Sequence, residues 1–247
     1  MTTGWHKFNS PHYFESLAAR FAPWCGAVAL ILLIVGCTWG LFFAPADYQQ
    51  RDAFRIIYVH VPMATLSMGV YVSMAAAGAL YFIFDIKLAA YYCRSVAVLG
   101  AAFTALALLT GAIWGKPMWG AYWTWGDARL LSELILLFLY LGYMSLVSSI
   151  DQETLADKIG SIMLIVGVIN IPIIHYSVVW WNSLHQGATI LKLDSPSMDS
   201  EMLIPLLINL LGISLYTVAY ALTAMRTQII EQRNQCQLLK SSGTFDE

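Results

Sequence analysis

Six long apolar stretches dominate this sequence and limit the folds that are open to it. They lie at about residues 22–44, 61–84, 95–114, 130–150, 160–181 and 203–225. A bilayer hydrocarbon core about 30 Å thick needs roughly 20 helical residues to cross it, so each stretch is long enough to span. The stretches are continuous and lack the alternating pattern of membrane β-strands. The sequence therefore predicts an all-α integral membrane protein, with six transmembrane helices and short loops in a single membrane domain over residues 1–247.

The charge content agrees with a membrane location. Only 11% of the residues are charged and the mean hydropathy is +0.65, whereas soluble domains average about 25% charged residues. Six crossings place both termini on one side, and the side richer in Lys and Arg is expected to be cytoplasmic. Of the 13 Lys and Arg residues, eight would lie on the side of the termini. Five would lie on the opposite side: Arg51, Arg55, Lys116, Arg129 and Lys192. The sequence therefore predicts cytoplasmic termini.

A tryptophan-rich segment, residues 114–129, joins the third and fourth stretches. It reads WGKPMWGAYWTWGDAR and contains four of the chain's nine tryptophans: Trp114, Trp119, Trp123 and Trp125. One or two tryptophans are common anchors at a membrane boundary. Four of them beside Arg129 favour a surface for a flat apolar ligand, because aromatic faces stack on such ligands and a guanidinium pairs with carboxylates.

Two histidines are expected at the level of this tryptophan-rich segment. Helical rise places His60 about 36 Å from a helix end near Phe84, and His185 about 37 Å from one near Gly160. Neutral imidazole is a common axial ligand of haem iron, so two of them could bind opposite faces of one porphyrin. A lone histidine at this level is more often a polar anchor, and the pair beside four tryptophans favours the ligand interpretation.

Charged side chains near the same rim have two interpretations. Arg55 and Arg129 are candidates to bind the two propionates of a haem, or they are arginines that extend to the interface from helix ends. Asp127 is expected to be the N-cap of the fourth helix and is a candidate to orient either Arg129 or a backbone amide of the tryptophan-rich segment. Glu133, one turn beyond Arg129, is expected to pair with it.

Four further polar residues are assigned supporting positions. His175 and Asn170 fall at the depth of the hydrocarbon region. We expect His175 to have a buried hydrogen-bonding role, and as an ionisable group inside the membrane it is also a functional candidate. Asn182 and Gln186 flank His185 and are candidates to fix the orientation of its ring.

Three separated motifs resemble a known family of haem-handling membrane proteins. WGKPMWGAYWTWGDARLLSELILLFLYLGY resembles the tryptophan-rich "WWD" signature, and RIIYVHVP around His60 and IPIIHYSVVWWNSLHQG around His185 stand in the same order as in the cytochrome c maturation protein C (CcmC) family, also called haem exporter protein C. The resemblance covers all six stretches, from about Arg20 to Arg226.

This resemblance implies a multi-pass protein of the bacterial cell inner membrane that binds haem b at its periplasmic face and delivers it to the haem chaperone CcmE. His60 and His185 would be the axial ligands, and the tryptophan-rich segment would be the haem platform. The implied partners are CcmE, CcmD, the ABC transporter subunits CcmA and CcmB, and membrane lipid, with no nucleic acid. The chain is then a haem-binding and delivery protein rather than a free-standing enzyme.

The sequence departs from the family pattern at one position. The family has the aspartate directly after the last tryptophan, whereas Gly126 stands between Trp125 and Asp127 here. One added residue turns a helical side chain by about 100°, so the register of Asp127 and Arg129 depends on whether the glycine lies within the loop.

Two other functions stay open at this level. The chain could be the membrane subunit of an ABC-type haem transporter; it has no GxxxxGK[ST] motif, so ATP hydrolysis would take place in a partner. It could also be a cytochrome c haem lyase, although such synthetases resemble it only in the tryptophan signature and are larger. The absence of CxxCH argues against covalent c-type haem in the chain itself.

Overall fold

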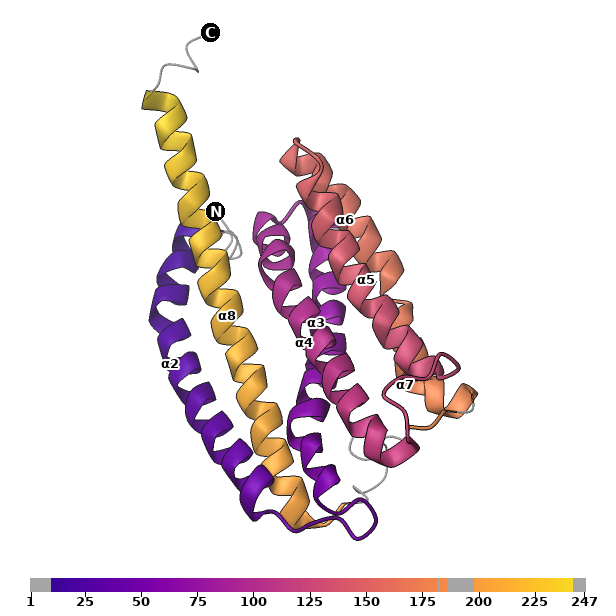
Figure 1. Cartoon of the computed structure of the whole chain (residues 1–247). Helices are drawn as coiled ribbons and strands as arrows, with labels where there is room; N and C mark the ends of the chain where they lie inside the picture. Colours follow the sequence, from indigo (N-terminus) through magenta and orange to yellow (C-terminus); the bar gives the residue numbers. More distant parts are fainter. Residues whose placement is uncertain (1–9, 182, 186–197, 242–247) are drawn as a thin grey trace.

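The protein is a bundle of long helices, shown in Figure 1. The computed structural model describes residues 10–181, 183–185 and 198–241, and within these ranges no β-strand forms, apart from one isolated bridge between Asp47 and Arg51. Six helical spans in the described residues are long and apolar enough to cross a bilayer. The expected all-α membrane fold with six spanning helices is confirmed.

The helices follow one another with short connections. The first span consists of α2 (Pro11–Thr38) and a π-helical turn, η1 (Trp39–Phe43). A short 3-10 helix, η2 (Asp52–Ile56), leads into α3 (Ile57–Phe84). The remaining helices are α4 (Lys87–Trp119), α5 (Ala128–Ser148), α6 (Glu153–Gly167), α7 (Asn170–Trp180) and α8 (Ser200–Ser241).

The first and last helices form a pair beside the other five. Figure 1 shows α2 and α8 side by side along one flank, α3 and α4 in the middle, and α5, α6 and α7 on the opposite flank. The beginning of α2 and the end of α8 lie toward the same end of the bundle. The tryptophan-rich segment lies at the opposite end.

Local sequence signals explain where several helices stop and start. Gly120 ends α4 with φ of 78°, a left-handed conformation that glycine adopts without strain. Asp127 is the N-cap of α5, and its side chain accepts hydrogen bonds from the backbone N–H groups of Arg129 and Leu130. Pro172, in the first turn of α7, has no N–H to donate, which explains why the fifth span divides into α6 and α7.

Aromatic and small residues meet in the core between α3, α4 and α5. Tyr140 is fully buried, and its hydroxyl donates to the Ser67 carbonyl at 2.7 Å. A Cβ at Gly100 would lie 2.3 Å from the Tyr140 ring, so a larger residue there would displace α4 from α5. Many large apolar side chains face outward instead, where lipid would cover them, for example Leu30, Ile31 and Val166.

The observed spans are longer than the apolar stretches that indicated them. The first span, Pro11–Phe43, begins well before residue 22, and the last, Ser200–Leu238, continues well past residue 225. Polar residues at these ends extend a helix without adding to the apolar signal. The single helix expected at 160–181 is interrupted at residues 168–169.

Candidate functional site

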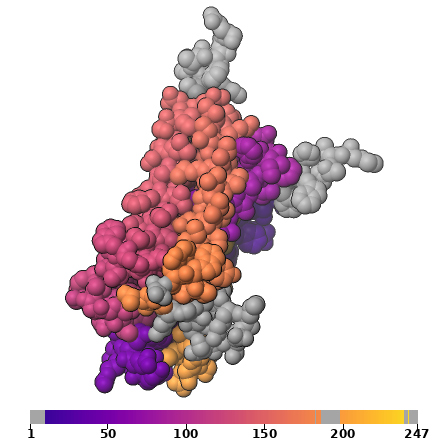
Figure 2. Space-filling model, turned by 90° about the vertical axis from the view of Figure 1, so that its right-hand side faces the viewer, coloured from indigo at the N-terminus to yellow at the C-terminus, as the bar shows by residue number. Residues whose placement is uncertain are grey.

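Four segments that are distant in the sequence meet at one end of the bundle. Figure 2 shows that the violet segment before α3, the magenta tryptophan-rich segment, the orange end of α7 and the light-orange start of α8 gather at this end. We call it the rim. The candidate ligand histidines, the four tryptophans of the tryptophan-rich segment, Arg55, Asp127 and Arg129 lie at or near this rim.

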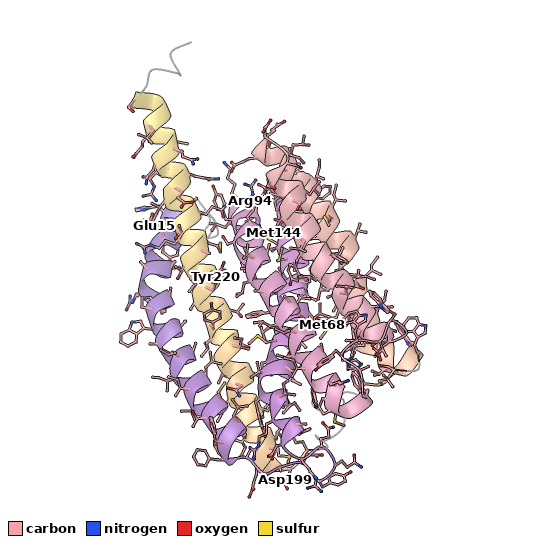
Figure 3. All side chains as sticks on the ribbon, in the orientation of Figure 1. Glu15, Met68, Arg94, Met144, Asp199 and Tyr220 are labelled. Atoms are coloured by element: carbon pink, nitrogen blue, oxygen red, sulfur yellow. The ribbon has the colours of Figure 1, made fainter. Side chains whose placement is uncertain are left out.

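A cavity of about 890 Å³ opens between these segments. Its volume falls in the usual range for pockets that hold small ligands or cofactors. It reaches from Asp199 at the rim to Met68 well inside the bundle, and Figure 3 labels both residues. Most of its wall is apolar. The polar and charged side chains that line it are Asp47, Gln49, Gln50, His60, Thr65, Arg129, Glu133, His175, His185, Asp199 and Glu201.

His60 lines the cavity from the first turn of α3. Its Nδ1 lies 3.0 Å from the hydroxyl oxygen of Thr110 on α4. Its ring makes an edge contact with Trp114, with the centroids 5.6 Å apart. A Cβ at Gly111 would lie 3.1 Å from the His60 ring, so the glycine gives the imidazole room beside α4.

His185 lines the same cavity from a different part of the chain. It lies beyond the end of α7 at Trp180, so the continuous helix assumed in placing it by helical rise was wrong, although its position at the rim is observed. Its Nδ1 is 3.2 Å from a carboxylate oxygen of Asp127 and 3.3 Å from the Ser183 hydroxyl. Trp119 makes an edge contact with the ring at 4.7 Å between centroids.

Asp127 is the centre of a buried hydrogen-bond network. Besides capping α5, its second carboxylate oxygen accepts from the Ser183 hydroxyl at 2.8 Å and the Leu184 N–H at 2.9 Å. Burial alone would raise the pKa of this carboxyl, but the hydrogen bonds from Ser183, Leu130 and Leu184, together with His185, hold it below its usual value. The side chain is therefore a carboxylate at neutral pH.

The protonation of His185 follows from its surroundings. Burial lowers its pKa below the usual 6.5, Asp127 acts in the opposite direction, and the net shift is downward. The imidazole is thus neutral at pH 7, and its contact with Asp127 is a hydrogen bond from Nδ1–H to a carboxylate rather than an ion pair. Nε2 then keeps a free lone pair.

The four tryptophans of the tryptophan-rich segment take different positions. Trp114 and Trp119 line the cavity, and Trp114 donates from Nε1 to the Gln50 side chain at 2.9 Å. Trp123 and Trp125 contact each other edge to face at 5.5 Å and are not among the residues that line the cavity. Trp125 is 73% exposed, whereas the indole N–H of Trp123 is buried.

The two candidate arginines also differ. Arg129 lines the cavity, and its guanidinium donates a hydrogen bond to the backbone carbonyl of His175 at 3.5 Å. Arg55 does not line the cavity; it forms an ion pair with Asp52 at 3.0 Å and donates to the Gly40 carbonyl at 3.1 Å. Of the two, Arg129 is therefore the one positioned to meet a ligand in the cavity.

Glu133 has a different partner from the one expected. Its carboxyl accepts from the Ser67 hydroxyl at 2.8 Å, and the described residues include no direct ion pair between Glu133 and Arg129. The expected pairing one turn apart was therefore wrong as a contact, because Arg129 turns toward His175 and Glu133 toward α3.

The remaining polar candidates are only partly described. His175 lines the cavity, and its ring makes an edge contact with Tyr176. Asn170 is buried and donates to the Ser132 carbonyl at 2.9 Å. Asn182 and Gln186, the expected supports of His185, lie outside the described residues.

Sequence reasoning missed three residues that support the site: Thr110, Gln50 and Ser183. Thr110 stands one helical turn before Trp114, a spacing that could have placed it on the same face. Gln50 and Ser183 lie in loops, where no periodic signal exists. Gly126 lies in the turn before α5, so the added residue is accommodated within the loop and leaves Asp127 at the N-cap.

The sequence is similar over most of its length to a known protein family. The family model described as "Heme exporter protein C" matches residues 4–240. The chain is 46% identical over 227 residues to Heme exporter protein C of Haemophilus influenzae, covering 92% of each chain. It is 45% identical to the Escherichia coli protein of the same name, covering 91% of this chain and 90% of that one.

A more distant relative comes from a plant. The chain is 41% identical over 196 residues to a "putative cytochrome c biosynthesis ccmC-like mitochondrial protein" of Marchantia polymorpha, covering 79% of this chain and 82% of that protein. The residues matched by the family model, 4–240, include the rim and all six helical spans of this chain.

Proposed function

The chain belongs to the Heme exporter protein C family, and from this premise we propose that it binds haem at the rim and delivers it to the haem chaperone CcmE. Family membership and six spanning helices make it a multi-pass membrane protein with a general role in haem handling. The finer proposal is that His60 and His185 are the axial ligands of haem b.

One observation carries this proposal. Two imidazoles from segments about half the chain apart line one largely apolar cavity, and each has its Nδ1 engaged by a neighbouring side chain. Nε2 of each ring is then the nitrogen left for iron, the arrangement in which histidine usually binds a metal. When bound, haem supplies an iron with two axial positions and a planar apolar ring.

The other cavity residues fit the remaining parts of a haem. Trp114 and Trp119 offer aromatic surface beside the two imidazoles, and Arg129 offers a cation for a propionate. Trp123 and Trp125 are proposed to extend the platform outside the cavity, and Trp125 has the exposure needed to contact a partner. Arg55 is proposed as a second cation near the rim. Asp127 is proposed to hold His185 in orientation.

We further propose that the rim faces the periplasm of a bacterial inner membrane and that the termini are cytoplasmic. The excess of Lys and Arg on the terminal side supports this orientation. Reporter fusions test it: a phosphatase, active only in the periplasm, should be inactive when fused after Ser241 and active when inserted at Gly120. The reverse pattern would overturn the orientation.

The proposed partners follow from the same premise. The names of the relatives connect them with haem export. The chain has no GxxxxGK[ST] motif, so ATP hydrolysis in such a complex would take place in another chain. We propose CcmA and CcmB as the transporter subunits and CcmD as the small accessory subunit.

Haem delivery can be measured directly on the chaperone. The full chain is co-expressed with CcmE and the other partners, and haem bound to purified CcmE is quantified. His60→Ala and His185→Ala should each reduce this haem to background, whereas His12→Ala, an exposed residue at the far end of α2, should not. Normal delivery in both variants would contradict the proposed site.

A further inference from the structure

The two histidines proposed as haem ligands have chemically unlike partners at Nδ1. His185 faces a carboxylate and His60 faces a hydroxyl. In a symmetric site the two imidazoles would be equivalent ligands. The difference between their partners makes them unequal.

The hydroxyl beside His60 can act only as an acceptor toward the ring. Thr110 donates its own proton to the Leu106 carbonyl at 2.6 Å, one turn earlier in α4. Its oxygen is therefore left to accept the Nδ1–H of His60 at 3.0 Å. The other acceptor beside this ring, the Ala107 carbonyl, is also uncharged. His60 is thus held by neutral acceptors alone.

The acceptor beside His185 carries a charge and is fixed in place. The Asp127 side chain is 1% exposed, and backbone N–H groups and the Ser183 hydroxyl hold both of its oxygens. A hydrogen bond to a carboxylate is roughly twice as strong as one between neutral groups. Such a partner also makes the imidazole a more basic ligand.

We propose that Thr110 is a positioning residue for His60, and that the unlike partners make His60 the weaker ligand, the one that yields when haem leaves the cavity. This inference rests on the proposed haem ligation by His60 and His185. Thr110 fixes which ring nitrogen of His60 is free but adds little to its basicity. Asp127 does both for His185.

Refilling each ligand position with a small molecule tests the inequality. His60→Gly and His185→Gly chains are loaded with haem in detergent and titrated with imidazole and with 1-methylimidazole, which lacks an N–H. Imidazole entering the His185 position can donate to Asp127. The preference for imidazole over 1-methylimidazole should therefore be about fivefold greater in His185→Gly than in His60→Gly.

Variants at Thr110 test the same inference in a chain that keeps both histidines. Thr110→Val removes the acceptor, so the midpoint potential of the haem should rise and part of the oxidised haem should become high-spin. Thr110→Ser should restore both properties. Thr104→Val is the matched control, because Thr104 makes the same kind of backbone hydrogen bond in α4, to the Gly100 carbonyl at 2.8 Å, whereas the hydroxyl beside His60 is that of Thr110. This variant should resemble the wild type.

Each outcome has a distinct meaning. Equal imidazole preferences in the two glycine variants, or a Thr110→Val chain with the potential and spectrum of Thr110→Ser, would overturn this inference and leave the ligand assignment intact. A wild-type spectrum without two histidine ligands would overturn the proposed site and this inference together.

Discussion

At the scale of single residues, Asp127 connects more of the rim than any one ligand does. It caps α5, holds the Ser183 and Leu184 segment and accepts from His185. A cap is worth about 1 kcal/mol, and each buried donor left without a partner costs about 1–3 kcal/mol. The side chain therefore stabilises the fold as well as contacting His185, the proposed ligand.

Replacing Asp127 should reduce stability and haem content together. We expect Asp127→Ala to lower the free energy of unfolding by about 2 kcal/mol, because a helix cap is lost and two part-buried donors, the Ser183 hydroxyl and the Leu184 N–H, lose their acceptor. Thermal unfolding in detergent and haem absorption measure the two effects. Asp151→Ala, at an exposed position between α5 and α6, is the control; equal behaviour of the two variants would contradict the role given to Asp127.

The pH dependence of haem binding should reflect the low pKa of His185. Burial lowers this pKa below 6.5, so the unfolded chain takes up the proton near pH 6.5 and the folded chain only at lower pH. The contribution to stability is complete above pH 6.5 and is lost as the pH falls from there through the folded pKa. The carboxylate of Asp127 raises the pKa of His185, whereas the positive charge of Arg129 lowers it further.

Haem absorption followed from about pH 8 downward tests this dependence. The two-histidine spectrum should persist at pH 6.5, where half of the ordinary imidazoles are protonated, and should be lost only at lower pH. A midpoint at or above pH 6.5 would contradict the lowered pKa of His185.

Residue patterns predicted that the main candidate residues lie together at one end of the bundle, but not which contacts they make. His60, His185, Trp114, Trp119 and Arg129 line one cavity, as a rim-level cluster of these residue types suggested. The partners of each ring depend on side-chain directions across helices, which sequence spacing does not give. The Glu133 partner was mistaken for this reason, and Thr110 was missed.

At the scale of elements, the close approach of α3 and α4 positions His60. Gly111 lies beside its ring, where a Cβ would be 3.1 Å from the imidazole. Helices pack this closely where one of them presents a glycine. The same device recurs at Gly100 beside Tyr140 and at Gly36 beside Asn209.

A single methyl group at Gly111 should therefore weaken haem binding. Gly111→Ala should push the His60 ring aside by a few tenths of an ångström. Haem affinity should then fall by about tenfold, the lower end of the range seen when a residue that orients a metal ligand is replaced. Haem titration measures the change. Gly69→Ala on α3 is the control, because a Cβ there meets nothing within 4 Å. Wild-type haem affinity in both variants would contradict the role of Gly111 in positioning His60.

The lengths of the apolar runs predicted the number of spanning segments, but not the places where a spanning segment is interrupted. Length and hydropathy alone identify six spans because lipid requires continuous helices. The break between α6 and α7 leaves the run of apolar residues intact. Pro172 lies next to this break, but a proline alone does not predict one, because Pro62 lies inside the unbroken helix α3. Tertiary contacts, including the hydrogen bond from Asn170 to Ser132, distinguish the two cases.

At the scale of the whole molecule, the bundle has one functional end. The cavity, both histidines and the tryptophan-rich segment lie at the rim, while the start of α2 and the end of α8 lie at the other end. Ion pairs at that other end join Arg94 to Glu153 and Asp157, and Arg233 to Glu15. In the described residues, the cavity thus lies at one end of the bundle and these ion pairs lie at the other.

The central claim is that one haem is bound at the rim by two imidazoles from distant parts of the chain. Electron paramagnetic resonance of the oxidised, haem-loaded protein tests it most directly, because two axial histidines give a low-spin iron signal. The wild type and His175→Ala should show this signal, and His60→Ala and His185→Ala should each lose it to a high-spin signal or to loss of haem. A low-spin signal unchanged in both of the last two variants would contradict the account.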